Sequence, residues 1–496
     1  MLNKPQNVHI KKGADILYVP LIFVGLIGGL GIIAQGLVYN WMLTCIGLVG
    51  LPIGLFYLYK IFQNPRLGMW SVLVYCFVWS LIARYLFAYT RISLPFGLGV
   101  DGLLFLTFVA MIFSGGAKAP YTILQNKLVV LTFLWFFFVF LQLFNPQATS
   151  KIAWFYAMRC YALYLFFTVI LTYMLLNQKE DLDRFFLLFV GFSIFGGLYG
   201  AYQLNIGLNY ADSIFIQPKL DRHMLFGKLR VFSFYENAGQ AGVSQAHAGL
   251  IANILFIHEK RRNYKIYYCI GMLACYYGMA ISGTRGALVV PIIGMGVYLV
   301  WCRKPIVTIS GIIVGAVILF LLVFTTVGQS NYTINRMRTA FDPNDPSFQY
   351  RMEARAHYQE YMNKHAFGWG IGTAGYWGNR FNGEDNVMTG TDGGYVQLQA
   401  EIGIVGLYFY WFYYSFILGA TFWMLLKLKD SELYPKVLAL CCGIMGLLAA
   451  NYGNSVIYQL PSNLTISMSL VYIWMARSWA LGEDLPKFES KFNTKY

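Results

Sequence analysis

Charged side chains are scarce in this sequence. They make up 12% of its 496 residues, whereas apolar residues make up 58%. A soluble chain carries about 25% charged residues, so this chain has too little polar surface to dissolve in water as a globular protein. Aromatic residues are abundant instead, at 18%, and Trp and Tyr favour the interfaces of a bilayer. The composition therefore indicates an integral membrane protein.

Motifs for metals, disulfides and nucleotides are also missing. The eight cysteines are scattered through apolar stretches, and none stands at zinc-ligand spacing from a histidine. This pattern excludes a disulfide framework and a structural zinc site. Ligand spacing is equally absent among the histidines His223, His247, His357 and His365. Neither an HExxH motif nor a P-loop occurs, so we expect no metal and no cofactor.

Long apolar runs account for most of the chain. A spanning helix needs about 20 mostly apolar residues, and we count about 12–14 such segments. They lie near residues 16–36, 40–59, 68–88, 98–115, 128–146, 153–176, 185–206, 239–257, 265–282, 286–302, 306–327, 395–426, 435–452 and 461–481. The predicted fold class is all-α, a polytopic transmembrane helical protein. Because Lys4, Lys11 and Lys12 precede the run from Ile16, we interpret that run as a first span and not as a removed signal.

The basic residues that give the chain its net charge of +15 are placed in a pattern that predicts its topology. Basic residues cluster in alternate loops between the apolar runs, which is how orientation is encoded in membranes. These clusters predict cytoplasmic positions for both termini and for Lys60, Arg66, Lys118, Lys127, Lys179, Arg184, Lys260, Arg261, Arg262, Lys265, Arg303, Lys304, Lys427, Lys429 and Lys436. A nucleic-acid partner is not expected.

The same alternation places two long polar loops outside. The first covers about 207–238 and belongs to the transmembrane region 1–327. The second, a large periplasmic loop, covers 328–393, and the C-terminal helices with a cytoplasmic tail occupy 394–496. Long loops translocate largely regardless of their charge, so their polarity is compatible with this arrangement.

The larger loop is predicted to be partly helical. Turn residues at 342–346 precede Ser347, which can cap a helix that runs toward Lys364. Arg351 and Arg355 are four residues apart and therefore share a face of that helix. They have two interpretations: a surface helix whose cations face water or lipid headgroups, or a pair of cations aimed at an anionic group beside the membrane.

Arg285 is the most informative single residue. It lies in the short external hairpin Ser282–Gly286 between two apolar runs. An arginine at the bilayer edge is costly without a partner or a wet cavity. It could snorkel to phospholipid headgroups. Alternatively, the flanking glycines allow close backbone approach, and a guanidinium binds phosphate with two hydrogen bonds. The second interpretation makes the hairpin a phosphate clamp.

Two further stretches combine polar and aromatic residues. In the first external loop, Arg230 and Glu236 stand among rings that suit either sugar faces or an interfacial belt. Before the next apolar run, Asp392 precedes Tyr395 at the mouth of a helix. A carboxylate there is favoured by the positive helix N-terminus, so Asp392 is either a cap or a general base toward a hydroxyl group. His365, with Glu353, is a weaker candidate for that base.

Taken together, these motifs resemble the O-antigen ligase and Wzy-type polysaccharide polymerase family. The matching pieces are the hairpin Ser282–Gly286, the segment from Arg351 to Gly372, and the segment from Thr391 to Gly406 with its Ala-Glu-Ile-Gly-Ile-Val-Gly ending. The resemblance covers mainly 225–410. The motifs are loose individually, but their order, spacing and common outside placement make the combination fairly specific.

The resemblance implies a membrane glycosyltransferase of the GT-C kind that acts, without a metal, on glycans carried by undecaprenyl diphosphate. The essential arginines of the family correspond by motif position to Arg230 and Arg285. Ligase members usually have a histidine in a Thr-His-Asn-like box, whereas this chain has Thr391-Asp392-Gly393-Gly394. This departure favours a polymerase over a ligase.

We therefore expect a polymerase of surface polysaccharide repeat units (O-antigen, capsule or exopolysaccharide) on the outer face of the bacterial inner membrane. The alternatives are a ligase that transfers finished glycan to another acceptor, and a flippase or transporter of lipid-linked oligosaccharide. The expected catalytic residues are Arg230, Arg285 and Asp392, and the expected substrate-binding residues are Arg351, Arg355, His365, Glu236 and Tyr395. The expected partners are the lipid-linked glycan and membrane lipid, with a chain-length regulator and a flippase of the same pathway as candidate protein partners.

Overall fold

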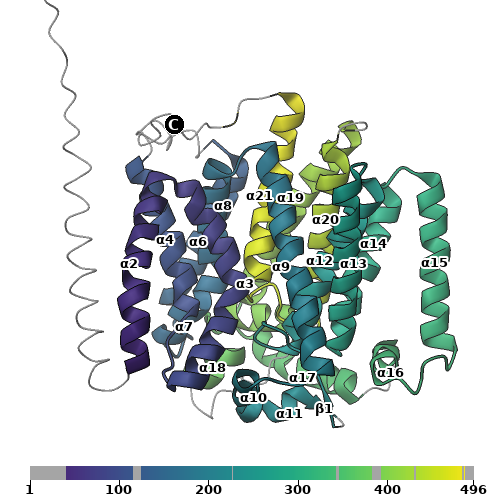
Figure 1. Ribbon diagram of the computed structural model, residues 1–496, viewed down its shortest axis with the longest axis horizontal. Helices are drawn as coiled ribbons and strands as arrows, with labels where there is room; N and C mark the ends of the chain where they lie inside the picture. Colours follow the sequence, from purple (N-terminus) through teal and green to yellow (C-terminus); the bar gives the residue numbers. More distant parts are fainter. Residues whose placement is uncertain are drawn as a thin grey trace, which may run out of the picture.

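Long, nearly parallel helices dominate the computed structural model of the chain (Figure 1). The structure describes residues 41–114, 125–225, 227–341, 346–381, 393–428, 432–482 and 485. The long helices are α2 (Trp41–Gln63), α3 (Pro65–Thr90), α4 (Gly97–Ser114), α6 (Lys127–Leu141), α9 (Lys179–Asn205), α12 (Ala238–His258), α13 (Arg262–Ile281), α14 (Val289–Trp301), α15 (Pro305–Phe324), α19 (Gly394–Lys427), α20 (Leu433–Ala450) and α21 (Ser462–Leu481). One further long helix consists of three consecutive segments: α7 (Lys151–Met158), the π-helical turn η2 (Arg159–Leu163) and α8 (Tyr164–Leu175).

Every apolar run predicted from 40–59 onward coincides with one of these helices. The run near 16–36 lies outside the described residues. Eight described helices are long and apolar enough to cross a membrane by their length and composition. Other long helices, such as α12, α13 and α21, carry more polar residues and lie in the same bundle (Figure 1). The predicted all-α, polytopic membrane fold is confirmed.

Helix α12 lies at the centre of the bundle and contacts α9, α13, α14 and α20. Its sequence is rich in Gly, Ala and Ser, and its residues 240–252 are buried. Small residues allow neighbouring helices in a membrane to approach closely. A Cβ atom on Gly242 would meet the side chains of Ser282 and Thr284. The first turns of α12 therefore lie directly against the hairpin Ser282–Gly286.

Helix α15 stands at the edge of the bundle, on the side opposite α2 (Figure 1). It packs against α14, and none of its residues is buried. Because α15 is also the most apolar of the eight candidate spans, its exposed surface is suited to lipid.

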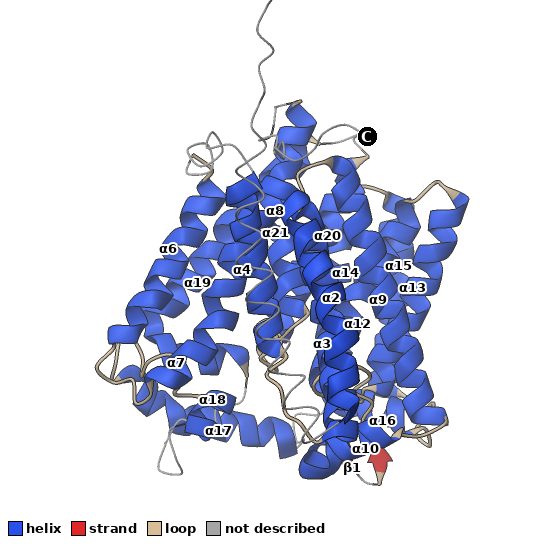
Figure 2. Cartoon of the chain, turned by 60° about the vertical axis from the view of Figure 1, so that its left-hand side comes forward, coloured by secondary structure: helices blue, strands red, loops and turns tan. Residues whose placement is uncertain are grey.

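The short elements gather at one end of the bundle, which we call the cap end (Figures 1 and 2). The first cap loop, residues 206–237, contains α10 (Tyr210–Ile216), η3 (Gln217–Lys219), α11 (Leu220–His223) and the antiparallel strands β1 (Met224–Leu225) and β2 (Lys228–Leu229). The second cap loop, residues 325–393, contains α16 (Tyr332–Arg338), η5 (Thr339–Phe341), α17 (Pro346–Asn363) and α18 (Gly375–Phe381). Two 3-10 turns lie at the same end, η1 (Gln142–Phe144) and η4 (Arg285–Leu288).

The turns at the other end, which we call the basic end, join α2 to α3, α8 to α9, α12 to α13 and α14 to α15 (Figure 1). These turns and the adjoining helix ends carry the predicted cytoplasmic cations Lys60, Arg66, Lys179, Arg184, Lys260, Arg261, Arg262, Lys265, Arg303 and Lys304. Lys118, Lys429 and both termini lie outside the described residues. The helix predicted within the larger loop is α17, so the partly helical cap is confirmed as well.

A buried ion pair attaches the first cap loop to the bundle. The guanidinium of Arg84, on α3, donates to the carboxylate of Asp212 on α10 at 3.2 Å and to the carbonyl of Ser233 at 2.7 Å. Tyr199 and Gln203 of α9 each donate to Asp212 at 2.8 Å. The Arg84 and Asp212 side chains are 1% and 0% exposed. This network pairs the two buried charges and attaches the loop to α3 and α9.

We expect the substitution Arg84→Met to lower the free energy of unfolding by about 3–5 kcal/mol, because it leaves the Asp212 carboxylate buried without its cation. The measurement is the thermal unfolding midpoint of the purified protein in detergent. Arg261→Gln is the matched control, since Arg261 pairs with Glu259 at 2.9 Å while its own side chain is 54% exposed. An exposed pair contributes about 0–1 kcal/mol. Equal midpoints for the two variants would contradict a structural role for the buried pair.

Candidate functional site

The hairpin Ser282–Gly286 joins α13 to η4 at the cap end. Gly283 has a φ of +60°, a conformation that glycine adopts without strain. The hydroxyl of Thr284 donates to the carbonyl of Ala238 at 2.9 Å and thereby attaches the hairpin to the start of α12. A Cβ atom on Gly286 would meet the amide of Asn454. The two glycines therefore allow the turn and a close approach of the loop that follows α20.

The first cap loop brings Arg230 to this hairpin. The Nη2 of Arg230 donates to the Thr284 hydroxyl at 3.3 Å, and its Nη1 donates to the carbonyl of Arg222 at 3.2 Å. The backbone nitrogen of Arg230 donates to the carbonyl of His223 at 2.8 Å. Of the two arginines predicted to be catalytic, Arg285 belongs to the hairpin and Arg230 contacts it from the first cap loop.

The second cap loop approaches the hairpin from α16 and η5. The Nε of Arg336 donates to the carbonyl of Gly283 at 2.8 Å. The Nη1 of Arg285 lies 3.4 Å from the carbonyl and 3.5 Å from the hydroxyl of Thr339. Arg336 was missed by the sequence analysis. The available signal was the pair Arg336 and Arg338 in a short segment that the side chain of Asn331 caps.

The guanidinium groups of Arg230 and Arg336 thus contact the hairpin that carries Arg285, so three arginines lie together at this place. The contacts described above go to neutral oxygen atoms of the protein and position the three side chains. Guanidinium groups recognise phosphate oxygens through charge-assisted hydrogen bonds. The arrangement is chemically suited to an anionic group such as a phosphate or diphosphate.

The second cap loop is also clamped onto α19. Gly403 interrupts α19 with a φ of +68° and a ψ of −173°. At this break, the backbone nitrogens of Trp369 and Gly370 donate to the carbonyls of Ala400 and Glu401, both at 2.9 Å. We call this contact between segment 366–374 and segment 400–405 the clamp.

The side chain of Glu401 adds a further bond to the clamp. This residue is 0% exposed, and its carboxylate accepts a hydrogen bond from the backbone nitrogen of Ala374 at 3.1 Å. In the sequence analysis the Ala-Glu-Ile-Gly-Ile-Val-Gly stretch was a motif of the resemblance. In the structure it holds the larger loop on the membrane helix.

A loop that the sequence analysis did not single out lies at the centre of the cap end. This loop, residues 451–461 between α20 and α21, contacts the hairpin through Asn454. The carbonyl of Asn451 accepts from the backbone nitrogen of Gly394 at the start of α19, at 2.8 Å. The hydroxyl of Tyr452 accepts from Arg355 of α17 at 2.9 Å. The loop therefore connects the hairpin with the two elements that carry other predicted site residues.

Other predicted site residues have contacts away from the hairpin or are not described in full. The His365 ring lies edge-on to Trp369, with 4.6 Å between the ring centroids. The Tyr395 hydroxyl donates to the carbonyl of Leu448 at 2.6 Å, and its ring packs against Trp411. Asp392 lies outside the described residues, and Arg351 is placed only as a backbone position of α17.

Two titratable groups of the first cap loop have shifted pKa values. Burial raises the pKa of Glu236 from its ordinary value, against the opposing charges of Lys219 and Arg84. Burial also lowers the pKa of His223 to about 4, and the positive charge of Arg230 acts in the same direction. Near neutral pH the histidine beside Arg230 is therefore uncharged, while Glu236 is a half-buried carboxylate that accepts a proton more readily than an exposed one.

Comparison with known proteins supports the resemblance found in the sequence. Residues 270–411 match a family model described as O-antigen ligase. The matched region contains the hairpin, α16, α17 and the clamp, but not Arg230. No curated protein matches the chain. Among the described residues, no group of three or more His, Cys, Asp or Glu side chains could hold a metal ion. The resemblance to the O-antigen ligase and Wzy-type polymerase family is confirmed over the matched residues.

We expect Gly403→Ala to open the clamp. The region of φ and ψ that Gly403 occupies costs another residue about 1–3 kcal/mol, and the new Cβ would meet the carbonyl of Ala366 and the nitrogen of Gly368. Hydrogen exchange at the amides of Trp369 and Gly370 should become about tenfold faster or more. The control is Gly296→Ala on α14, where a Cβ meets nothing within 4 Å. Unchanged exchange in Gly403→Ala would contradict the clamp.

We expect the stability of the cap end to fall as the pH is lowered from about 6.5 to about 4, the pKa of His223 in the unfolded and folded chain. The folded state prefers the neutral ring, so stability is complete above the unfolded pKa and is lost as protons bind. The loss is at most about 3 kcal/mol. The measurement is the unfolding midpoint against pH for the wild type and for His223→Gln. This comparison separates His223 from Glu236, and identical pH profiles would contradict the prediction.

Proposed function

We propose that this protein is a membrane glycosyltransferase that polymerises repeat units of a surface polysaccharide. The family match supports a function of the O-antigen ligase or polymerase type. The single observation that carries the proposed site is that Arg230 and Arg336 contact the hairpin that contains Arg285. In this proposal the three guanidinium groups bind the diphosphate of an undecaprenyl-diphosphate-linked glycan.

The chemistry of the reaction explains why arginines would suffice at the leaving group. A sugar hydroxyl of the acceptor attacks the anomeric carbon of the donor glycan and forms the new glycosidic bond. The bond between that carbon and the phosphate oxygen breaks, and undecaprenyl diphosphate leaves with the electron pair. The negative charge that develops on the leaving oxygen is stabilised by cations held in place beforehand. The proton of the attacking hydroxyl passes to a base.

Asp392 is the base we propose for that proton, on the basis of its position in the sequence just before α19. Positioned bases contribute about 10²–10⁴-fold to such reactions. Glu236 is proposed to bind the glycan, because it is a half-buried carboxylate that follows the loop carrying Arg230. Arg355 is proposed to bind it as well, since it is exposed on α17 and bonded to Tyr452 beside the start of α19.

We assign the cap end to the outer face of the bacterial inner membrane and the basic end to the cytoplasm. The support is the positive-inside rule, because the cytoplasmic clusters predicted from the sequence lie in the turns of the basic end. An external site requires a donor that arrives on a lipid carrier and not as a nucleotide sugar. A flippase and a chain-length regulator of the same pathway would act on the same lipid-linked glycan.

A ligase is the second candidate, and the family match supports it as much as a polymerase. The two functions differ only in the acceptor. For a polymerase the acceptor is another lipid-linked repeat unit, and for a ligase it is a different molecule. The polymerase is preferred here because Asp392 stands where ligases usually have a histidine.

We expect Arg285→Ala and Arg336→Ala each to reduce transfer by about 10²–10³-fold, the usual cost of removing one charge-stabilising donor. The assay reconstitutes the purified protein with undecaprenyl-diphosphate glycan and measures lengthened product and released lipid diphosphate. Arg380→Gln is the control, because Arg380 is exposed on α18 and bonds to Tyr376 of the same helix at 3.1 Å.

The outcomes of this assay distinguish the alternatives. Normal transfer by Arg285→Ala would overturn the proposed site. Product that forms only when a different acceptor is added would indicate a ligase. Movement of the lipid-linked glycan across the membrane without any new bond would indicate a transporter. Unfolding midpoints equal to that of the wild type are required of each variant.

A further inference from the structure

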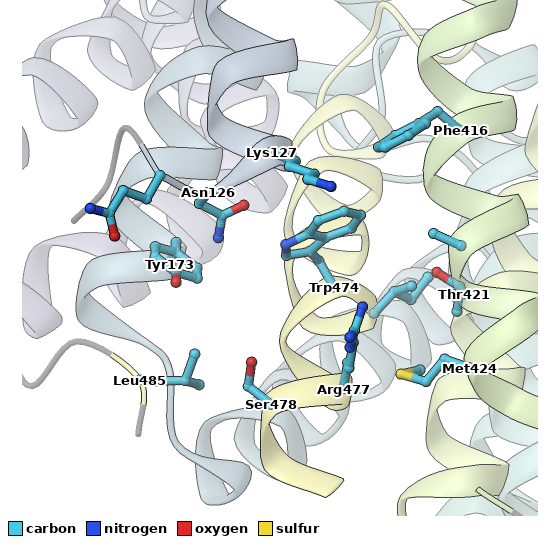
Figure 3. Close-up of a pocket in the computed structure, with 13 residues that line it drawn as sticks. Asn126, Lys127, Tyr173, Phe416, Thr421, Met424, Trp474, Arg477, Ser478 and Leu485 are labelled. Carbon is cyan, nitrogen blue, oxygen red and sulfur yellow. The ribbon is translucent and has the colours of Figure 1, made fainter. Parts of the chain in front are cut away.

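A large cavity opens at the basic end, far from the arginine hairpin. Its volume is about 640 Å³, within the range of about 300–1,000 Å³ that small-molecule pockets have. The start of α6, the end of α8 and the last turns of α19 and α21 surround it (Figure 3). Because the cavity and the hairpin lie at opposite ends of the bundle, the cavity is separate from the site described above.

The lining of this cavity is amphipathic. In Figure 3, Trp474 of α21 lies between two cations that border the open space. Lys127 of α6 is above Trp474, and Arg477 of α21 is below it. Phe416 and Met424 of α19 form an apolar side. The thirteen lining residues that the structure describes include no Asp or Glu.

The wall therefore combines two cations with apolar surface in one hollow. A free inorganic anion would use the cations but would gain nothing from the apolar side. A neutral hydrocarbon would use the apolar side but not the cations. An amphiphilic anion uses both. The position of the cavity favours a membrane lipid among amphiphilic anions. Trp474 is of a residue type that gathers at the bilayer interface, and Lys127 and Arg477 lie near helix ends.

We propose that this cavity is a binding site for an anionic phospholipid of the leaflet at the basic end. The phosphate of the lipid lies between Lys127 and Arg477, and the upper portion of its acyl chains lies against Phe416, Met424 and Trp474. Anionic lipids are enriched in the cytoplasmic leaflet, where each basic residue near the surface adds to their attraction. The site does not depend on the proposed transferase activity.

The test is lipid retention by the full-length protein, measured by native mass spectrometry after exchange into detergent with defined lipids. The wild type should retain phosphatidylglycerol at least tenfold more than phosphatidylcholine, because only the former carries a net negative charge. The double variant Lys127→Gln/Arg477→Gln should lose this preference. The matched control is Lys304→Gln, an exposed cation at the start of α15 on the same end of the molecule.

Three results would overturn the proposal. The first is an unchanged preference for phosphatidylglycerol in the double variant. The second is an equal loss in Lys304→Gln, which would indicate a general charge effect of the basic end. The third is displacement of the lipid by millimolar inorganic phosphate, which would indicate a site for a free anion. Trp474→Ala is a second variant that keeps both cations and removes apolar contact. It should weaken retention of long-chain lipid while its unfolding midpoint equals that of the wild type, which excludes a folding defect as the cause.

Discussion

Hydrogen bonds from arginine side chains to backbone carbonyls hold the cap end together. Arg84 donates to Ser233, Arg230 to Arg222, and Arg336 to Gly283. Irregular backbone that is buried within a protein needs partners for its polar groups. Arginine meets this need with five donors on a planar group that stays charged at any physiological pH. The same residue type therefore supports the loops and supplies the cations that we assign to the diphosphate.

The arginines of the cap end fall into two groups, one structural and one assigned to the diphosphate. Arg84 is fully enclosed, and Asp212 balances its charge, so its role is structural. Arg230, Arg285 and Arg336 are half-buried; Arg285 lies in the hairpin, and the other two contact it. The clamp at Gly403 and the loop 451–461 bring the second cap loop and the start of α19 to the same end. The family match covers most of this assembly, while Arg230 comes from the first cap loop outside it.

Much of the fold could be predicted from the sequence, because membrane-spanning helices are specified locally by length and hydropathy. The hairpin was predictable too, since Arg285 is a charge between two apolar runs. The pair Arg336 and Arg338 marks a basic segment in the sequence, but the contact of Arg336 with Gly283 depends on where α16 lies in the fold. The clamp was also hidden: Glu401 and Gly403 form a motif in the sequence, but their partners at 366–374 are known only once the chain is folded. Tertiary contacts between distant segments leave no periodic signal.

The exposed helix α15 connects the basic end to the second cap loop, and its length is close to that of a membrane span. Its 20 residues span about 30 Å, which is close to the hydrocarbon thickness of a bilayer. At its far end, Arg338 of α16 donates to the carbonyls of Leu322 and Val327, both at 2.9 Å, and so attaches α16 to the end of α15. A thicker or thinner bilayer would tilt or shift α15 and with it Arg336.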